Sequence, residues 1–450
     1  MIKKKKLLLI NPVSRYRKGF ARDLTSKHPP LALAIIASYT PSHWKIKIID
    51  ENYQTFHFRD ADLVGITSFT PSAPRAYEIA QQYRQRGIPV VFGGIHASMC
   101  PEEALNFVDA VVVGEAESVW PQLIDDFEKG KLQKIYHGSF QEMVNLPMPR
   151  HDLFHPAYVF HSVQTSRGCP MGCDFCTVTV FNGKHYRVRP VNEILDELES
   201  FRNDKRAVFF VDDNLGGMGE KHQERAMELF RGIIDRGIKI NWFSQTSLDI
   251  ADNEELLRLA ADSGCRILLI GIEAETVEAL KSANKSLNVK KGVENYQKIF
   301  KKINKYGIAV LGTFIFGLET DNIESIRNRA SYIINSKVDC VQTSILTPLP
   351  GTQLHKRVVA QNRLICKDFP HDWQYFHFAD IVFRHPVMRA EEMAPELIKA
   401  WKRIYNPWRL IISFFRTWRN TRHLTSAVWA YQTNKHYRNI LFERDIWYGN

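Results

Sequence analysis

The N-terminal third of the chain alternates short runs of consecutive apolar residues with longer stretches of helical periodicity. We predict strands at residues 6–10, 45–49, 63–68, 90–93 and 110–114. Helices are predicted between them at residues 31–39, 74–86 and 117–127. Strands that are apolar throughout and separated by helices are typical of a parallel sheet covered on both faces. The pattern therefore predicts a doubly wound α/β domain over residues 1–135.

A second alternation of the same kind begins after residue 158. Pro147, Pro149 and Pro156 interrupt regular structure before it, so we expect an extended linker over residues 136–158. Six further strands are predicted at residues 159–165, 207–212, 238–244, 266–272, 308–316 and 340–347. Helical stretches lie between them at residues 192–202, 221–236, 253–263, 276–281, 289–306 and 322–336. Six strand–helix units predict a partial (β/α)6 barrel of the TIM type over residues 159–351.

The last part of the chain, residues 352–450, has a helical pattern throughout. Helices are predicted at residues 390–405, 408–420 and 425–442. Residues 401–450 hold nine Lys or Arg against two acidic residues and contain twelve aromatic residues. Three interpretations compete for this C-terminal helical domain: a cap that packs on the barrel, a lipid-like substrate pocket with contact to an anionic membrane, and nucleic-acid binding. The third is the weakest, because no nucleic-acid-binding module is recognisable.

The overall composition favours an intracellular globular protein. The 450 residues are 44% hydrophobic and 24% charged, and the seven cysteines are an odd number. Odd, largely dispersed cysteines fit a reducing compartment better than a disulfide framework. Four lysines precede a short apolar run at the N-terminus, but that run ends at Asn11-Pro12, too soon for a signal peptide. We therefore expect a cytoplasmic protein.

Three of the cysteines stand close together after the first strand of the predicted barrel. Cys169, Cys173 and Cys176 have three-residue and two-residue spacings, and glycines between them let the backbone fold back. Three thiolates in this spacing can converge on one metal centre. A structural zinc site would need a fourth ligand, for which His161 or His185 could serve. A [4Fe-4S] cluster held by the same three thiolates would leave one iron open.

Polar residues and glycines follow the strands of both predicted sheets, where parallel sheets bind their ligands. The first domain carries Ser68 and Thr70, then Gly93 and Gly94, then Gly114 at three strand ends, a lining suited to a large flat ligand with a nucleotide tail. No G-x-G-x-x-G follows a strand, which disfavours a dinucleotide cofactor. The barrel strands end at the following residues: Asp213, Asn214, Glu273 and Gly317.

The cysteine motif and the order of these strand ends resemble the radical S-adenosylmethionine (radical SAM) enzymes. This resemblance implies that the open iron of a [4Fe-4S] cluster chelates S-adenosylmethionine and that an electron from the cluster releases a 5′-deoxyadenosyl radical. It also implies that Asp213 and Asn214 hold the amino group of SAM and that Glu273 reaches its ribose hydroxyls. Gly312 and Gly317 would then let the fifth strand approach the adenine.

The first domain resembles the flavodoxin-like, Rossmann-like cobalamin-binding domain that precedes the barrel in one branch of those enzymes. The matching segments are His28-Pro-Pro-Leu-Ala-Leu-Ala, Ile49-Asp-Glu, residues 65–70, Gly93-Gly-Ile-His and Gly114-Glu-Ala-Glu. The D-x-H-x-x-G element that supplies a histidine to cobalt in many cobalamin proteins is absent. We interpret His96 as a loop residue near the ligand rather than a cobalt ligand. A domain of this fold that has lost its ligand is the alternative.

These resemblances imply a cobalamin-dependent radical SAM methyltransferase that methylates an unactivated carbon. The alternatives are a radical cyclisation, rearrangement or oxidation without methyl transfer, and a cobalamin sensor with a zinc site. The enzyme readings require a reductant such as flavodoxin or ferredoxin and a small-molecule or lipid-like substrate. We expect no nucleic-acid partner, and the sequence does not identify the substrate.

Overall fold

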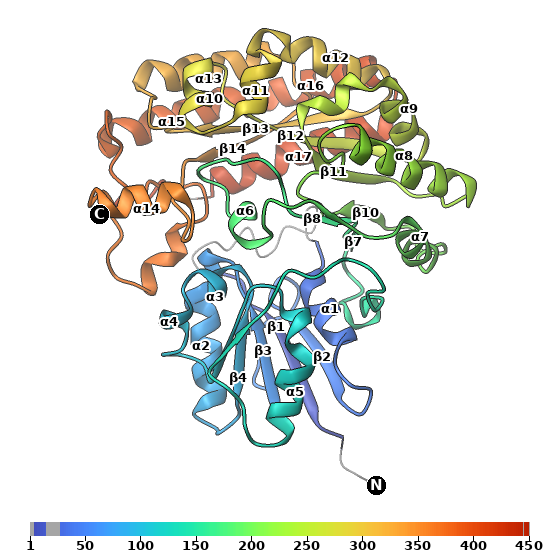
Figure 1. Ribbon diagram of the computed structural model, residues 1–450. Coiled ribbons are helices and arrows are strands. Elements are labelled where there is room, and N and C mark those ends of the chain that lie inside the picture. Colours follow the sequence, from blue (N-terminus) through green and yellow to red (C-terminus); the bar gives the residue numbers. More distant parts are fainter. Residues whose placement is uncertain (1–3, 15–27, 444, 450) are drawn as a thin grey trace.

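The chain folds into two lobes stacked end to end (Figure 1). The computed structural model describes residues 4–14, 28–443 and 445–449. The lower lobe has a six-stranded parallel sheet in the order β2-β1-β3-β4-β5-β6. Its strands are β1 (Lys6–Asn11), β2 (Lys45–Asp50), β3 (Leu63–Thr67), β4 (Val90–Gly93), β5 (Ala110–Val113) and β6 (Ile135–His137). This order confirms the doubly wound, flavodoxin-like α/β class.

Helices cover both faces of this sheet. They are α1 (Leu31–Ser38), α2 (Ala73–Arg84), α3 (Ile95–Met99), α4 (Pro101–Ala104) and α5 (Trp120–Glu128). On one face, Ile79 and Tyr83 of α2 pack with Phe92 of β4. On the other, Leu33 of α1 and Trp120 of α5 pack with the opposite side of the same strands. Burial on both faces explains why the strands are apolar throughout.

The sixth strand of the lower lobe was not predicted. β6 pairs with β5 in parallel, with Val111 opposite Ile135 and Val113 opposite His137. It falls at the boundary between the predicted first domain and the linker. Tyr136 is buried and its hydroxyl donates to Asp126, so one inward-facing aromatic side chain fixes the strand. A three-residue strand offers too short a pattern to be recognised from alternation alone.

The upper lobe is the predicted partial barrel. Its sheet runs in the order β14-β13-β12-β11-β10-β7, so the strands are adjacent in chain order and all parallel. They are β7 (Phe160–Val163), β10 (Ala207–Phe210), β11 (Trp242–Thr246), β12 (Cys265–Glu273), β13 (Ala309–Phe316) and β14 (Cys340–Ile345). The helices on the outer face are α7 (Val191–Glu199), α8 (Glu220–Asp235), α9 (Glu254–Asp262), α10 (Val277–Ser282), α11 (Ser286–Lys291), α12 (Tyr296–Lys305) and α13 (Ile323–Asn335).

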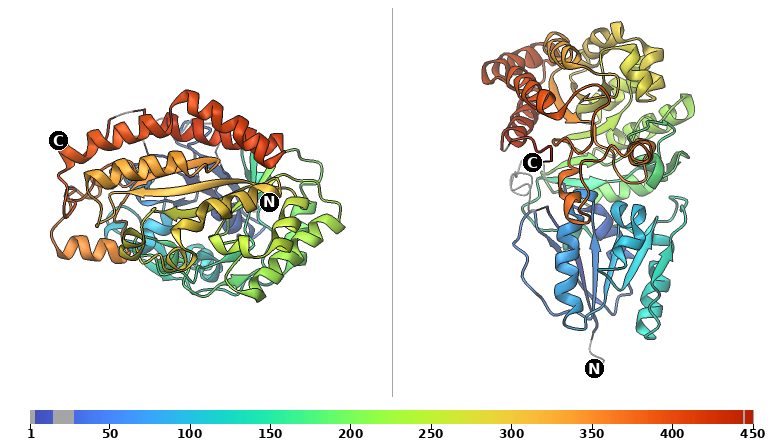
Figure 2. Two further views of the ribbon diagram at one scale, coloured as in Figure 1. Left: turned by 90° about the horizontal axis from the view of Figure 1, so that it is seen from above. Right: turned by 90° about the vertical axis from the view of Figure 1, so that its left-hand side faces the viewer.

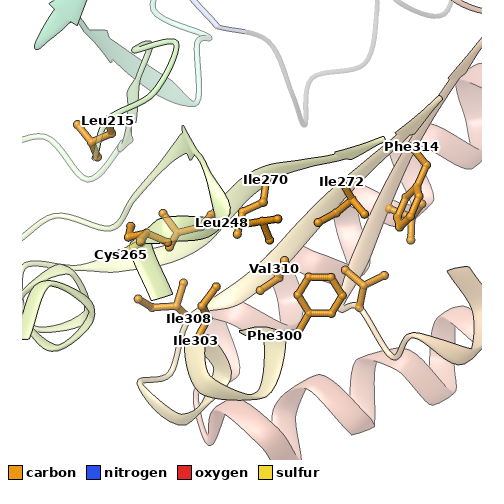
Figure 3. Packing of buried hydrophobic residues seen from close by; sticks show 14 of the residues in the cluster. Leu215, Leu248, Cys265, Ile270, Ile272, Phe300, Ile303, Ile308, Val310 and Phe314 are labelled. Atoms are coloured by element: carbon orange, nitrogen blue, oxygen red, sulfur yellow. The ribbon is translucent and has the colours of Figure 1, made fainter. Parts of the chain in front are cut away.

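The largest apolar core lies between these helices and the outer face of the barrel sheet. Figure 3 shows Ile270 and Val310 of the sheet packed near Phe300 and Ile303 of α12. One predicted helix, over residues 289–306, is divided in two. Gly292 has a φ of +78° and separates α11 from α12, so the chain changes direction there.

The C-terminal region adds four helices to the upper lobe, and the last two run along one flank of it (Figure 2). They are α14 (Gln353–Ala360), α15 (Ala390–Ile404), α16 (Pro407–Thr421) and α17 (Leu424–Leu441). Helix α17 packs across the concave face of the sheet, where Ala430 contacts a cluster that includes Ile267 and Leu311. One of the three interpretations of this region, a helical cap on the barrel, is therefore present, because α17 covers the concave side that six strands leave open. No helix among the described residues is long and apolar enough to cross a membrane.

Candidate active site

The three cysteines lie in a loop that is closed by a short hairpin between the lobes (Figure 1). Strands β8 (Ser166–Arg167) and β9 (Arg187–Val188) pair antiparallel, and residues 168–186 form the loop between them. Its first residue, Gly168, has a φ of +94°. A Cβ at that position would stand 2.2 Å from the carbonyl oxygen of His185, so only glycine permits this closure.

The cysteines open onto a cavity of about 380 Å³ at the carboxyl ends of the barrel strands. Three of the residues predicted for SAM binding line it with them, namely Asp213, Asn214 and Glu273. Lys285, Thr313 and Gln342 also line it. The structure therefore brings residues from β12, β13, β14 and the loop after β10 to the cysteine loop, which is where barrel folds place their chemistry.

The surroundings of the cysteines suit a cluster better than one zinc ion. The three Sγ atoms of the cysteines do not all lie within 4.8 Å of one another. Thiolates on a single tetrahedral zinc, with Zn–S bonds of about 2.3 Å, would be closer than that. His161, proposed as a zinc ligand, instead faces Asp204 at 3.2 Å and stacks on Phe201. His185 does not line the cavity.

Burial favours the protonated form of all three thiols. It raises the pKa of Cys169 and Cys173, and it raises that of Cys176 to about 12. Metal ions bind the thiolate form, so cluster insertion must displace these protons. The positive charge of Lys285 acts in the opposite direction on all three thiols. This lysine is the basic group that favours the thiolates.

Lys285 is the site residue that the sequence did not reveal. Its Nζ lies 2.7 Å from Oε1 of Glu273, while Thr313 donates to Oε2 of the same carboxylate at 3.2 Å. Burial lowers the pKa of Lys285, but the Glu273 carboxylate and Cys173 outweigh it and raise that pKa overall. Lys285 stands between two short helices in a stretch with three nearby lysines, so nothing in its local pattern marks it as a residue of the cavity.

Glu273 reaches the cavity because β12 ends irregularly. The register between β12 and β13 shifts between Gly271 and Glu273, and Glu273 has a φ of +64°. A bulky residue in the left-handed region costs about 1–3 kcal/mol and is found most often at functional sites. The conformation turns a side chain that is only 8% exposed toward Lys285 and Thr313.

Asp213 and Asn214 lie in the cavity beside Asp212, which has a different role. Asp213 accepts a hydrogen bond from Nδ2 of Asn182 at 3.0 Å, and burial raises its pKa. Asn214 is bonded to the carbonyl of Gly217 and to Ser247. None of these acids caps the following helix, because Gly219 occupies the N-cap position of α8.

Asp212 serves the loop rather than the cavity. It is fully buried and accepts hydrogen bonds from the backbone and hydroxyl of Thr165 and from the hydroxyl of Ser166. Burial raises its pKa to about 6. The side chain therefore fixes the chain at the point where it enters the cysteine loop.

Two predicted residues of the fifth barrel strand are not brought to the cavity. A Cβ on Gly312 would stand 3.1 Å from Val338 and 3.2 Å from the ring of Phe314, in the outer core. A Cβ on Gly317 would stand 2.4 Å from Met393 of α15. For Gly312 the reason is alternation, because Thr313 and Ile315 of β13 face the cavity and Gly312 must therefore face the helices. Gly317 lies beyond the end of β13, where the chain turns with a φ of +76°. The prediction located the strand but not its inward face.

A second cavity, of about 280 Å³, lies between the lobes at the carboxyl ends of the lower sheet. Gly93, Gly94 and Gly114 line it as predicted. Ser68 and Thr70 do not, and both are buried. Ser68 bonds the carbonyl of Phe69, and Thr70 lies 3.4 Å from Nδ1 of His96. Thr67, one residue earlier, lines the cavity instead.

His96 lies on α3 and is directed away from this cavity. It is fully buried, and its Nε2 contacts Tyr77 and Glu103 at 3.2 Å. The indole of Trp373 packs against it and also donates to Glu103. The side chain is thus a packed and hydrogen-bonded residue of the helix layer, and the interpretation of His96 as a loop residue near the ligand is wrong.

The cysteine loop separates the two cavities, and the hairpin that bounds it contributes contacts between the lobes. Phe181, at the end of α6 (Val178–Phe181), lines the cavity between the lobes, whereas Val178 lines the cysteine cavity. Two arginines of the hairpin bind acids that follow β5. Arg187 makes two contacts to Glu115, at 2.5 and 2.9 Å, and Arg167 lies 2.5 Å from Glu117.

Comparison with known proteins agrees with this geometry. The model of the radical SAM superfamily matches residues 163–333, and that of the B12 binding domain matches residues 17–124. A bacteriochlorophyllide d C-12(1)-methyltransferase of Chlorobaculum tepidum is 29% identical over 89% of this chain and 88% of its own length. A hopanoid C-2 methylase of Rhodopseudomonas palustris is 28% identical over 81% of this chain and 72% of its own.

A solved structure shows the same fold. The radical S-adenosylmethionine methyltransferase TsrM from Kitasatospora setae, with cobalamin and a [4Fe-4S] cluster bound, superimposes with a TM-score of 0.68 at 17% identity and covers 89% of both chains. The fold and the cysteine cavity thus define a radical SAM enzyme. The chain belongs to the branch of that family that carries a B12-binding domain, and it is an enzyme of the cobalamin-dependent methyltransferase type.

The residues present fit the cofactors of this family, which are a [4Fe-4S] cluster, SAM and cobalamin. Three thiols open onto one cavity, and no histidine of the described chain lines it with them. Glycines at three parallel strand ends line the cavity between the lobes. Enzymes of this family act on small molecules and need an electron donor.

Proposed function

We propose that this methyltransferase methylates an unactivated carbon of an apolar small molecule. The observation that carries the proposal is the position of the cysteine loop between a barrel cavity and a cavity at the strand ends of the lower sheet. When bound, the cluster supplies the electron that cleaves SAM, and cobalamin supplies the methyl group. The two curated relatives described above, which act on a bacteriochlorophyllide and on a hopanoid by their names, support an apolar polycyclic substrate.

The residues of the chain take the following proposed roles. Cys169, Cys173 and Cys176 bind three irons of the cluster. Asp213 and Asn214 bind the amino group of SAM, and Glu273 binds its ribose hydroxyls. Lys285 fixes the Glu273 carboxylate and offsets the negative charge of the thiolates. Gly93, Gly94 and Gly114 let the lower sheet approach cobalamin closely.

Several further features belong to the proposal. The reductant is a small electron carrier such as flavodoxin or ferredoxin, and the enzyme works in the cytoplasm. The C-terminal helical region makes peripheral contact with a membrane, which suits an apolar, lipid-like substrate. The proposed domain boundaries are residues 1–135, 136–158, 159–351 and 352–450.

The SAM step is tested by product formation. Anaerobically reconstituted protein with SAM and dithionite is expected to release 5′-deoxyadenosine, and Cys176→Ala should abolish this release because one iron loses its ligand. Cys366→Ala is the matched control, since Cys366 is a buried cysteine outside the cavity. Undiminished release by Cys176→Ala would refute the cluster assignment. A colourless, oxygen-stable protein would instead support the sensor with a zinc site.

The methyl step needs a separate readout. With SAM that carries a labelled methyl group, label is expected on cobalamin recovered from the protein and on the product. The visible spectrum of the purified protein measures its cobalamin content. Deoxyadenosine without any transferred label would favour a radical cyclisation, rearrangement or oxidation over methyl transfer.

A further inference from the structure

The outer face of helix α16 is apolar and faces solvent. Trp408, Ile412 and Phe415 are 75%, 63% and 56% exposed, and Ile411 and Trp418 are also exposed. These five residues recur at positions i, i+3, i+4, i+7 and i+10, so they lie on one side of the helix. We call them the α16 stripe. The helix runs along the flank of the upper lobe (Figure 2).

The inner face of the same helix is mostly polar. Thr417 donates to the buried carboxylate of Asp339 at 2.8 Å, and Ser413 donates to the Asp339 carbonyl at 2.9 Å. Arg416 donates to the carbonyl of Val338, and Arg409 to that of Ile334 at the end of α13. A helix on the surface of a globular protein normally has the opposite arrangement. These bonds hold the α16 stripe outward, so its exposure is not an accident of loose packing.

Charge identifies the surface that the α16 stripe fits. Residues 397–442 contain nine Lys or Arg and no Asp or Glu. Arg419 and Arg422 are exposed on the same side of the helix, beyond Trp418. An amphipathic helix that combines large apolar side chains with exposed arginines is typical of binding to an anionic lipid surface.

We propose that the α16 stripe docks this protein on anionic bilayers, with α16 lying in the plane of the membrane interface. A second copy is a poorer occupant, because two such faces would bring Arg419 and Arg422 of one copy close to the same two arginines of the other, with no acidic residue on residues 397–442 to pair with them. Nucleic acid is also poorer, since Ile411 and Ile412 offer it neither stacking nor charge. The proposal names the helix and the lipid for the membrane contact proposed above, and it is independent of the reaction catalysed.

The test is sedimentation of the full-length protein with lipid vesicles. One set of vesicles contains equal parts of phosphatidylcholine and phosphatidylglycerol, and the other contains phosphatidylcholine alone. We expect binding to the first set, weakened by about 0.5 M salt because exposed charges are then screened. The stripe variant Trp408→Ser/Ile412→Ser/Phe415→Ser should bind at least about tenfold more weakly.

Two further variants make the result specific. The control variant Val277→Ser/Val359→Ser/Val387→Ser removes three exposed apolar residues elsewhere and should bind as the wild type does. Arg419→Gln/Arg422→Gln should reduce the preference for phosphatidylglycerol. Iron content and circular dichroism of each variant report on folding, while 5′-deoxyadenosine release should be unchanged, which separates docking from catalysis.

Three outcomes would overturn the proposal. The first is a wild-type protein that stays in the supernatant with both sets of vesicles. The second is a stripe variant that sediments as the wild type does. The third is light scattering that shows a dimer of the wild type and a monomer of the stripe variant, since a second copy would then cover the α16 stripe.

Discussion

The ion pair between Arg187 and Glu115 joins the two lobes, and its removal should measurably destabilise the protein. Both side chains are buried, at 3% and 2% exposure. Removing one partner of a buried pair costs about 3–5 kcal/mol, because the other charge is left without compensation. In Arg187→Met, Glu115 keeps Arg167 at 3.2 Å and the backbone N–H of Gln141 at 2.9 Å. The expected cost is therefore at the lower end, about 3 kcal/mol.

Thermal unfolding of the full-length chain measures this cost. For a domain of about 150–250 residues, each kcal/mol lowers Tm by about 2–4 °C, so a loss of about 3 kcal/mol should lower Tm by roughly 6–12 °C. Glu115→Gln in the same chain removes the uncompensated charge and should restore part of the loss. The control is Asp152→Asn, which breaks the exposed pair with Arg150 and should cost less than about 1 kcal/mol.

The pH dependence gives an independent check. Burial alone would raise the pKa of Glu115, but the hydrogen bonds from Arg187 and the charge of Arg167 hold that pKa below its ordinary value of 4.5. A lowered pKa stabilises the fold above pH 4.5, and this stability is lost as the pH falls through the folded-state pKa. The difference in Tm between wild type and Arg187→Met should therefore shrink on acidification. The reasoning is refuted if Arg187→Met unfolds no earlier than Asp152→Asn.

Three further predictions concern the cysteine loop and its cavity. Gly168→Ala should lower the iron content after reconstitution, because the new Cβ would stand 2.2 Å from the carbonyl oxygen of His185. Gly172→Ala is the control and should retain its iron, because its Cβ would meet only the side chain of Asn284, at 3.3 Å. Equal iron contents in the two variants would contradict the steric argument. Lys285→Met should reduce 5′-deoxyadenosine release at least about tenfold, because it leaves the Glu273 carboxylate unpaired. Lys281→Met, at an exposed lysine, is the control, and the double variant Lys285→Met/Glu273→Gln should recover stability but not release. Full release by Lys285→Met would exclude the proposed role. Burial raises the pKa of Asp212 from 3.8 to about 6, so the free energy of unfolding should fall as the pH rises from 3.8 to 6. Urea titrations at a series of pH values measure this fall, and Asp212→Asn should remove it. An Asp212→Asn variant that shows the same fall would contradict the prediction.

Local patterns predicted five strands of the lower sheet, the six barrel strands, the cysteine centre and three of its companions in the cavity. The buried strands of parallel sheets are continuous apolar runs, and Asp213, Asn214 and Glu273 follow such runs directly. The sequence therefore indicated where along a strand each residue lies. It did not indicate on which face of the sheet the residue lies, and for this reason Gly312 and Ser68, which lie outside the cavities, were predicted to line them. When both faces of a strand are apolar, its sequence does not indicate which one faces inward.

Contacts between distant segments were out of reach of the sequence for a related reason. The partner of Arg187, Glu115, precedes it by 72 residues and lies in the other lobe. The aromatic α16 pattern suggested a cap or a lipid contact. The structure shows that α17 covers the sheet and that the polar residues of α16 face inward. Tertiary pairing decides these questions.

The hairpin of β8 and β9 links the loading of the cysteine loop with iron to the docking of the two lobes. Its two strands bound the loop that holds the cysteines, and its two arginines bind the acids of the lower lobe. Thermodynamic linkage is reciprocal: if the ordered loop favours the closed arrangement of the lobes, closed lobes must favour loading of the loop by the same factor. Iron loading and lobe docking thus share one free energy of coupling. A chain without its cluster would then have a weaker interface between the lobes. Proteases should cleave such a chain more readily in the connection between the lobes, at residues 138–158.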